Sequence, residues 1–470
     1  MEAGSELSSL VRLEVAASRL GHGARDTRLD AVTEALAAGP DKSLPQAFPS
    51  WTALKSAYRF FANEKVTPEA ILSGHVQRTV ARCRQLAVVL LVQDTTVLTL
   101  QHEVAGAGRV GPHGVQGLFV HTCLAVSAEE GHAVCGTLAQ ESWARAARAR
   151  GRRRSESGKQ RKARPVRESL RWAALALAAS EALGEGPGRP HGVHVFDREG
   201  DIFEALEVLD ALQDSWVVRA SRNRRLDTSE GAAEAAYLEA TVRAARVRGH
   251  CRVQVPPGPG RRARTALLEV RARRVRLLPP ANRKRRGEAL AVNVVLAEET
   301  HPPQGEKPLC WMLLTREPIA TLADCLAVVH LYTARWRIEE LHMGLKTGCG
   351  VEKRQLHEAS RVQRFLALAT VLAWGLLALR DAARVSPSPP ATHHLSDEQL
   401  RLLARLRPEM PAHPNAYEAL RALARLGGFI GRRSDGEPGW RTLWRGMDAL
   451  LSAEVGYRLA LTAPGPPDFG

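Results

Sequence analysis

Two aspartates, each placed directly after a run of apolar residues, are the first candidates for chemistry in this chain. Asp94 follows AVVLLVQ, which predicts a buried central strand with the carboxylate inside it or at its end. Asp197 follows VHVF at a strand end, and the ligands of open α/β sheets collect at strand ends. A buried carboxylate costs free energy unless it is paired or binds a cation. Each aspartate alone could instead be a turn residue or a helix N-cap.

A third acid, Glu339, lies in YTARWRIEELHMGLK, the segment 332–346, which is predicted to be a single helix. With about 100° between successive residues, one side of such a helix is apolar and a neighbouring arc is polar. The apolar side holds Ile338, Leu341 and Leu345, and the polar arc holds Tyr332, Arg335, Glu339 and Lys346. A simpler interpretation is a surface helix on which Arg335 and Glu339 form an ion pair, worth a few tenths of a kcal/mol.

Asp94, Asp197 and Glu339 would bring three carboxylates from two strands and one helix to one place. Hard oxygen ligands suit Mg²⁺ or Mn²⁺, which take their remaining ligands from water and substrate phosphates. Two such ions roughly 3.5–4 Å apart could activate a water or a 3′-hydroxyl and stabilise the leaving oxygen of a phosphoryl transfer. Neither Cys nor His is placed for a soft-metal site.

The charge of the chain favours a polyanion as its partner. There are 66 Lys and Arg against 50 Asp and Glu in 470 residues, a formal net charge of +16. The excess is clustered in an arginine-rich run from Arg145 to Arg171 and in a second run from Arg271 to Arg286. Solvated loops could explain either run alone, but two of them favour nucleic acid.

The cysteines and the hydropathy pattern favour a cytoplasmic protein. The seven cysteines include no CxxC pair, so a zinc ribbon or a disulfide framework is not expected. Neither end resembles a targeting segment, and the longest apolar stretch, FLALATVLAWGLLAL from Phe365, is shorter than a membrane span and is predicted to be a buried core helix.

The order of predicted elements is helical, then mixed, then helical again. Residues 1–75 are predicted to form short helices, with Ser50 and Thr67 as N-caps. From Leu86 to about 226, predicted strands alternate with helices in the manner of an α/β layer. Residues from about 227 to 310 are strand-like and basic, which predicts an antiparallel insertion, and the tail after Ser396 is predicted to be helical.

The three acids lie in motifs that resemble those of DDE transposases of the bacterial insertion-sequence type. One group of this family carries a Tyr-(2)-Arg-(3)-Glu-(6)-Lys signature, and YTARWRIEELHMGLK matches it without a gap. The family's first aspartate precedes Thr-Thr, as in QDTT, and its second opens an Asp-Arg-Glu-x-Asp-Ile segment, as in DREGDIF. The similarity extends over nearly the whole chain, and it is strongest to the composite-transposon transposase that works by cut and paste through a hairpin intermediate.

This resemblance implies a fold and three domains. The expected fold class is α/β, with a ribonuclease H-like catalytic core (76–380) interrupted by a β-rich insertion at about 227–310. An N-terminal helical domain (1–75) would bind the transposon end, and a C-terminal helical domain (381–470) would dimerise. The implied partners are double-stranded DNA, as transposon ends and target, and a second copy in a synaptic complex, with no membrane. The expected location is the bacterial cytoplasm, on the nucleoid when DNA is bound.

The resemblance also implies residue roles and a reaction. Asp94, Asp197 and Glu339 would be the catalytic metal ligands, for two Mg²⁺ or Mn²⁺ ions, and the adjacent Glu340 would not be a ligand. The reaction would be nicking, hairpin formation, hairpin opening and strand transfer. DNA contacts are implied for Tyr332, Arg335, Lys346, Arg219 and Trp311. Without the resemblance, Trp311 would be a core strand tryptophan and Arg219 a surface residue at a strand end.

The chain departs from the family pattern at a few positions. The segment ESGKQ has Gln160 where the family usually has an aromatic residue, and GLFVHT has smaller side chains than expected. These differences concern contacts to the end sequence more than the chemistry. The alternatives are a catalytically inactive DNA-binding descendant and a ribonuclease H-like nuclease without strand transfer. A glycosidase with two carboxylates would have no use for the net charge.

Overall fold

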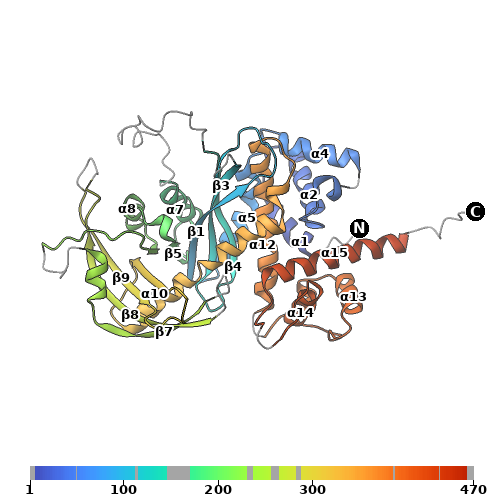
Figure 1. Cartoon of the computed structure of the whole chain (residues 1–470). Coiled ribbons are helices and arrows are strands. Elements are labelled where there is room, and N and C mark those ends of the chain that lie inside the picture. The colour runs from blue at the N-terminus through green and yellow to red at the C-terminus, as the bar shows by residue number, and fades with distance from the viewer. Residues whose placement is uncertain are drawn as a thin grey trace, which may run out of the picture.

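One large mixed sheet, with helices on both faces, forms the body of the molecule (Figure 1). The computed structural model describes residues 6–48, 50–111, 115–145, 170–229, 237–255, 264–281, 287–384, 387–432 and 435–462. Most of the first arginine-rich run, with Gln160, and the end of the second lie outside these ranges. The N-terminal and C-terminal helices pack at one side of the sheet.

The sheet of the described residues has ten strands in the order β2-β3-β1-β5-β6-β10-β9-β8-β7, with β4 also paired to β3. Strands β1, β5 and β6 run parallel, and every other pair is antiparallel. The strands are β1 (Val88–Thr99), β2 (Gly108–Arg109), β3 (Gln116–Ser127), β4 (Val134–Trp143), β5 (His191–Phe196), β6 (Ser215–Arg219), β7 (Val247–Val255), β8 (Arg264–Leu277), β9 (Leu290–Glu298) and β10 (Cys310–Thr315).

The insertion is antiparallel, as predicted from its sequence, but it is not a separate sheet. Strand β9 pairs with β10, and β10 pairs with β6, so β7, β8 and β9 extend the central sheet edge to edge. The insertion also contains a short helix, α9 (Leu238–Arg243). The strand that carries Trp311 therefore joins the insertion to the core.

The remaining α-helices lie along the chain as follows: α1 (Glu6–Val15), α2 (Gly23–Ala37), α3 (Leu44–Ala47), α4 (Trp51–Ala62), α5 (Pro68–Cys83), α7 (Leu170–Leu183), α8 (Phe203–Ala211), α10 (Leu322–Thr333), α11 (Trp336–Met343), α12 (Ala359–Ala383), α13 (Asp397–Leu406), α14 (Ala416–Leu426) and α15 (Trp440–Thr462). Short turns are η3 (Arg198–Gly200), η4 (Gly344–Gly348), η5 (Val351–Lys353) and η6 (Ala391–His393). The helical N-terminal and C-terminal parts agree with the sequence prediction.

Two predicted helix starts in the N-terminal part are confirmed. The Ser50 side chain accepts a hydrogen bond from the Ala53 N–H at the start of α4, and Thr67 does the same for Ala70 in α5. Pro68 occupies the first position of α5, where its missing N–H costs nothing. Each cap satisfies an amide that the first turn of a helix leaves without an intrahelical partner.

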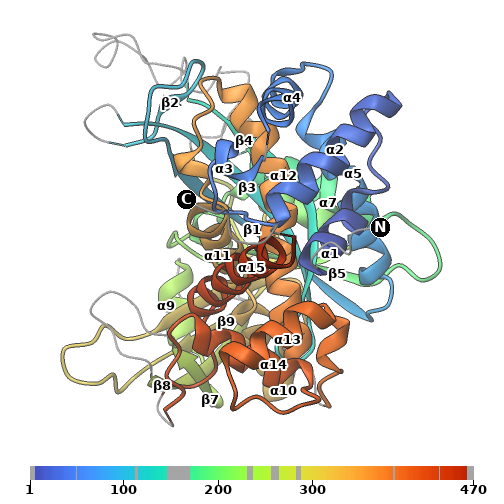
Figure 2. The same cartoon turned by 90° about the vertical axis from the view of Figure 1, so that its right-hand side faces the viewer.

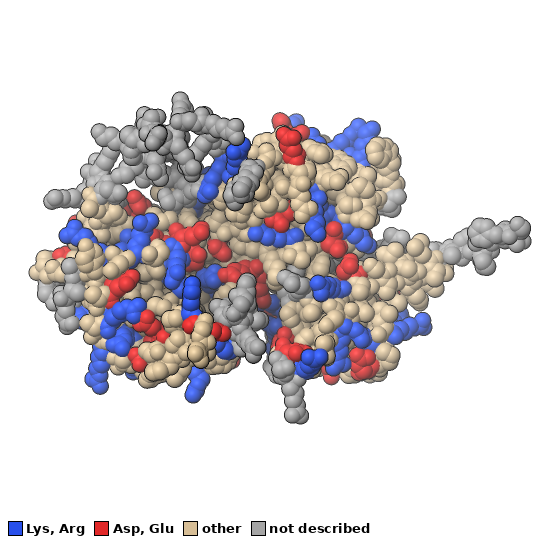
Figure 3. Space-filling view, in the orientation of Figure 1, with Lys and Arg blue, Asp and Glu red and all other residues tan. Residues whose placement is uncertain are grey.

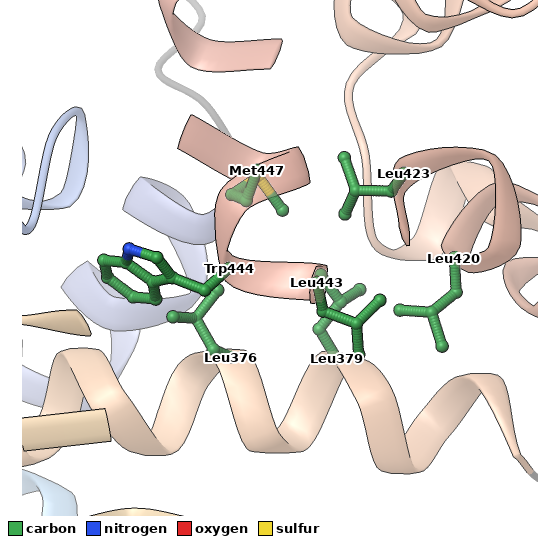
Figure 4. Close-up of a pocket in the computed structure, with 7 residues that line it drawn as sticks. All are labelled: Leu376, Leu379, Leu420, Leu423, Leu443, Trp444 and Met447. Carbon is green, nitrogen blue, oxygen red and sulfur yellow. The ribbon is translucent and has the colours of Figure 1, made fainter. Parts of the chain in front are cut away.

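Helix α12 lies at the centre of the helical part of the molecule (Figure 2). It contacts α1, α4 and α5 of the N-terminal part and α14 of the C-terminal part. It is apolar enough to cross a membrane by length and composition, but 83% of its most apolar window is buried inside the protein. The prediction of a buried core helix is confirmed. Its outer end meets α14 and α15 around a small apolar pocket (Figure 4), lined by Leu376, Leu379, Leu420, Leu423, Leu443, Trp444 and Met447.

A buried network of charges fixes α11 against α12. Arg380, whose side chain is 1% exposed, donates to Glu340 and to Asp381. Arg337 bridges the same two carboxylates from α11, and Asp381 also accepts from the N–H of Val134 at the start of β4. Glu340 is therefore a structural residue, and it holds the helix that carries Glu339.

The two adjacent glutamates should differ in their effect on stability. We expect Glu340→Gln to lower the free energy of unfolding by about 2–3 kcal/mol, because it leaves buried guanidinium groups short of a charge partner. We expect Glu339→Gln, whose side chain is 39% exposed, to change it by less than about 1 kcal/mol. Urea unfolding of both variants measures the difference, and equal effects would contradict the structural role of Glu340.

Candidate active site

The sheet brings Asp94 and Asp197 together. Gln93 in β1 is the parallel partner of Phe196 in β5, so the next residue of each strand is an aspartate at the same level of the sheet. Asp94 lies inside β1, and Asp197 directly follows β5 and caps η3 by accepting from the N–H of Glu199 at 2.7 Å. Asp197 is therefore an N-cap, as its position in the sequence allowed. The hydrogen bond uses one oxygen of the carboxylate, and the other oxygen takes no part in it.

The electrostatics of Asp94 show that the third acid is near. Burial raises the pKa of Asp94 to about 7, and the charges of Asp197 and Glu339 act in the same direction. Arg335 and a hydrogen bond from the N–H of Thr95 lower the pKa in part. The structure thus gathers the three predicted acids around a carboxylate that is 16% exposed. Figure 3 shows acidic side chains gathered near the middle of the molecule's face, with Lys and Arg around them.

The segment 332–346 is not the single helix predicted from its sequence. Helix α10 ends at Thr333 and α11 begins at Trp336, because the amides of Arg335 and Arg337 bond three residues back rather than four and tighten the chain into a turn. A π-helical turn, η4, then follows α11. Such turns widen the helix by one residue and are frequent at functional sites.

Part of the helix prediction is confirmed. Ile338, Leu341 and Leu345 are buried on one side, as the apolar spacing indicates. Tyr332, which was assigned to the polar arc, is 3% exposed and belongs to the last turn of α10, where the charges of Arg335 and Asp197 act on it.

Arg335 is the cation closest to the acids. Its guanidinium contacts the Glu339 carboxylate at 2.6 Å, with the two side chains 13% and 39% exposed. The ion pair of the simpler interpretation therefore exists, but the buried arginine also acts on Asp94. Within the described ranges, no three Asp, Glu, His or Cys side chains are arranged to hold one metal ion as they stand.

Tyr332, Trp311 and Arg219 form a layer beside this cluster. The rings of Tyr332 and Trp311 meet edge to face at 5.2 Å, and Trp311 is 5% exposed. Arg219, at the end of β6, donates to the carbonyl of Cys310 at 2.8 Å. Burial raises the pKa of Tyr332, against the charges of Arg335 and Arg219. Trp311 occupies a core position here, and its role in base stacking stays a prediction.

Lys346 is carried by the π turn and is half-buried. No carboxylate of the described part of the chain lies within ion-pair distance of it in the structure. Its charge acts on His342, whose pKa is lowered to about 3, mainly by burial. The lysine is therefore available to an anionic ligand, as its predicted phosphate contact requires.

Two histidines near the acids, His342 and His121, were missed by sequence reasoning. The Nδ1 atom of His342 lies 3.9 Å from Asp94, and its buried Nε2 has no hydrogen-bond partner among the described residues. On the other face of β1, Thr95 bonds His121 at 2.8 Å, and His121 bonds Gln93. His342 follows Glu339 by three residues, a spacing that could have signalled it. His121 could not be found, because its strand register is not visible in the sequence.

The DREGDIF motif divides into two roles. Asp201 is 1% exposed and pairs with the buried Arg224, and it also accepts from the amides of Ser221 and Arg222. These bonds fix the loop after β6 against the turn after β5. Asp201 is thus a structural acid, whereas Asp197 faces the other candidate ligands.

Two segments of the chain match known family models. Residues 8–66 match the model described as Transposase DNA-binding, and residues 371–463 match the Transposase Tn5 dimerisation domain. The two matches support a transposase of the Tn5 type. The first covers α1 to α4 and the second runs from inside α12 through α15, so DNA binding and dimerisation are supported for the two helical parts of the chain.

We expect the ionised carboxylate of Asp94 to lower the stability of the folded protein, so that an uncharged residue at this position should raise it. The folded pKa of about 7 lies above the ordinary value of 3.8, so the ionised carboxylate destabilises the fold, and this loss grows as pH rises from about 4 to 7. We expect Asp94→Asn to be more stable than the wild type by about 1–3 kcal/mol above pH 7, with the difference vanishing near pH 4.

Thermal unfolding as a function of pH measures this difference. Asp201→Asn is the matched control, because its carboxylate is paired, and we expect this variant to be destabilised by about 3 kcal/mol. An Asp94→Asn variant less stable than the wild type at pH 8 would mean that the carboxylate is a structural partner and not a strained site.

Proposed function

We propose that the chain is a DDE transposase that excises and inserts a mobile element by phosphoryl transfer at Asp94, Asp197 and Glu339. The observation that carries the proposal is the placement of Asp94 and Asp197 at the same level of neighbouring parallel strands, with the helix that carries Glu339 packed on the strand of Asp94. The charges of Asp197 and Glu339 both act to raise the pKa of Asp94. The N-terminal match supports binding to DNA, and the C-terminal match supports a homodimer. The reaction would comprise nicking, hairpin formation, hairpin opening and strand transfer into target DNA.

The donor set fits Mg²⁺ or Mn²⁺. All three side chains offer hard oxygen atoms, and the like charges that raise the pKa of Asp94 are what a divalent cation would balance. The ion pair with Arg335 uses one oxygen of Glu339, so Glu339 would join the two aspartates either through its other oxygen or after this ion pair opens. Two bound ions would supply activation of the attacking oxygen and stabilisation of the leaving oxygen.

The cations around the acids suit a phosphate ligand. Arg335, once released from Glu339, presents a planar fork for two phosphate oxygens, and Lys346 presents a point charge. Arg219 and Tyr332 would contact the same strand from the neighbouring layer. Because Trp311 packs against Tyr332 in that layer, a base flipped from the duplex could reach it only if the tyrosine ring moves.

A ribonuclease H-like core is the fold that we propose for the catalytic part. It is supported by a sheet in which the antiparallel strands β4, β3 and β1 lead into the parallel strands β5 and β6. The first acid lies on the central strand, the second after its parallel neighbour, and the third on a helix packed against that strand. This arrangement brings acids that are far apart in sequence to the carboxyl end of the parallel pairing between β1 and β5.

The first test is cleavage of DNA that carries the element's ends, with purified protein and Mg²⁺. We expect nicks and hairpins from the wild type, and none from Asp94→Ala or Glu339→Gln, with end binding retained. Glu185 is an exposed acid in the loop between α7 and β5. Glu185→Gln is therefore the control and should cleave normally. End binding without product from any protein would favour an inactive descendant. Nicks without strand transfer would favour a nuclease.

A second test concerns Trp311. We expect Trp311→Ala to lower the ratio of hairpin to nick and Trp311→Phe to retain it, because an aromatic face is what a flipped base requires. Since the side chain is buried, the Ala variant should also lose about 3–5 kcal/mol of stability, so both variants are assayed well below their melting temperatures. A normal hairpin ratio in Trp311→Ala would leave this residue a core residue only.

A further inference from the structure

A buried arginine ties the N-terminal helices to the segment that carries Lys346. Arg354 is 3% exposed, and its guanidinium donates in two directions. One side reaches the carbonyls of Pro40 and Lys42, in the turn after α2, inside the segment that matches the DNA-binding model. The other reaches the carbonyl of Cys349 at 2.8 Å, directly after the π turn. The Phe365 ring lies under the guanidinium at 4.7 Å.

The segment between Lys346 and Arg354 is held at its other side by the catalytic strand. The Glu352 carboxylate accepts from the N–H of Thr99 at 2.8 Å, at the end of β1, and the Glu352 carbonyl accepts from Gln101. Gly350 adopts a φ of 56°, which an L side chain would strain. The short segment 344–354 is therefore hydrogen-bonded at one side to the turn after α2 and at the other side to the end of the strand that carries Asp94.

Arginine is required for this connection by its shape. A guanidinium is a rigid fork whose N–H groups point outward from three nitrogen atoms, so Nη1, Nη2 and Nε of Arg354 reach carbonyls on two segments at once. A lysine has three N–H groups on a single nitrogen atom and cannot span the same distance with a fixed geometry. The carbonyls of Pro40 and Cys349 belong to buried residues and therefore need a donor, which Arg354 supplies. No described carboxylate is within ion-pair distance of Arg354, which indicates that the residue is placed for geometry and not to neutralise an acid.

We propose that Arg354 is a positioning residue that sets the distance between the end-binding helices and Lys346. The N-terminal helices would hold the transposon end by its sequence, and the segment 344–354 would transmit that position to Lys346 and Glu339. The phosphate that is cut is then fixed by where the end is bound. This inference rests on the proposed function, because it assumes that residues 8–66 hold the end that the acids cleave.

The test maps the cleaved phosphate at single-nucleotide resolution, with duplexes that carry the ends of the element encoding the chain. We expect the wild type to cut one phosphate. Arg354→Lys should bind the ends with nearly unchanged affinity, cleave on the order of 10–100-fold more slowly, and spread its cuts over neighbouring phosphates. Cutting at the single wild-type phosphate and rate would overturn the proposal.

Arg364 provides the matched control. It is also buried and also donates to carbonyls of the N-terminal part, those of Phe61 and Val66, but from α12 and not from the Lys346 segment. We expect Arg364→Lys to lower the melting temperature without spreading the cuts. If it spreads them as Arg354→Lys does, the effect belongs to general loosening and the proposal fails.

A second variant, and a measurement that does not depend on catalysis, separate the role of Arg354 from the proposed function. Glu352→Ala removes the side-chain bond to Thr99 at the other side of the segment. Because Glu352 is partly exposed, this variant should fold, and it should spread the cuts in the same way. Cutting at a single phosphate at the wild-type rate would contradict the proposed role of segment 344–354. Hydrogen exchange of residues 344–353 should slow when end duplexes bind to the wild type and not to Arg354→Lys. A wild type that shows this protection but never cleaves would overturn the proposed function and leave the connection standing.

Discussion

The placement of a carboxylate inside a buried strand is the constraint on which the rest of the structure depends. Asp94 sits beside Asp197 in a partly buried part of the sheet, and its burial together with the nearby charge of Asp197 raises the pKa of Asp94 to about 7. Arg335 offsets part of this rise, and its own pairing with Glu339 keeps the third acid close without forcing it onto the other two.

The surrounding elements compensate for this local instability with paired charges. The network of Glu340, Arg337, Arg380 and Asp381 holds α11 on α12, and Asp201 with Arg224 holds the turn after β5. In both networks every acid faces a guanidinium. Burial raises the pKa of Glu340 and of Asp381 as it does that of Asp94, but only at Asp94 do two further acids, both among the proposed metal ligands, add to the effect.

The sequence was sufficient to place Asp94 and Asp197 in or after strands and to predict the helix caps and most strands, because these depend on local patterns. Asp94 and Asp197 could be placed from apolar runs, and Ser50 and Thr67 from their position before helices. The break before Trp336 could not be predicted, since TARWRIEE has helical propensity throughout and the turn is fixed by tertiary contacts. Arg354 and Arg380 were missed because their partners are backbone carbonyls or distant acids, which leave no signature in sequence spacing. The continuity of the insertion with the core depends on edge pairing of β9 with β10, which sequence patterns do not specify.

That edge pairing also bears on how such a molecule can diversify. The sheet grows outward from β10 through β9 and β8 to β7, so the outermost strand is the one farthest from Asp94 in the strand order. Strands could be lost from or added to that margin without changing the hydrogen-bond partners of β1 or β5. Variation in length among related chains should therefore concentrate at the β7 margin, while the inner strands keep their spacing, and a foreign module grafted there would leave the acids undisturbed.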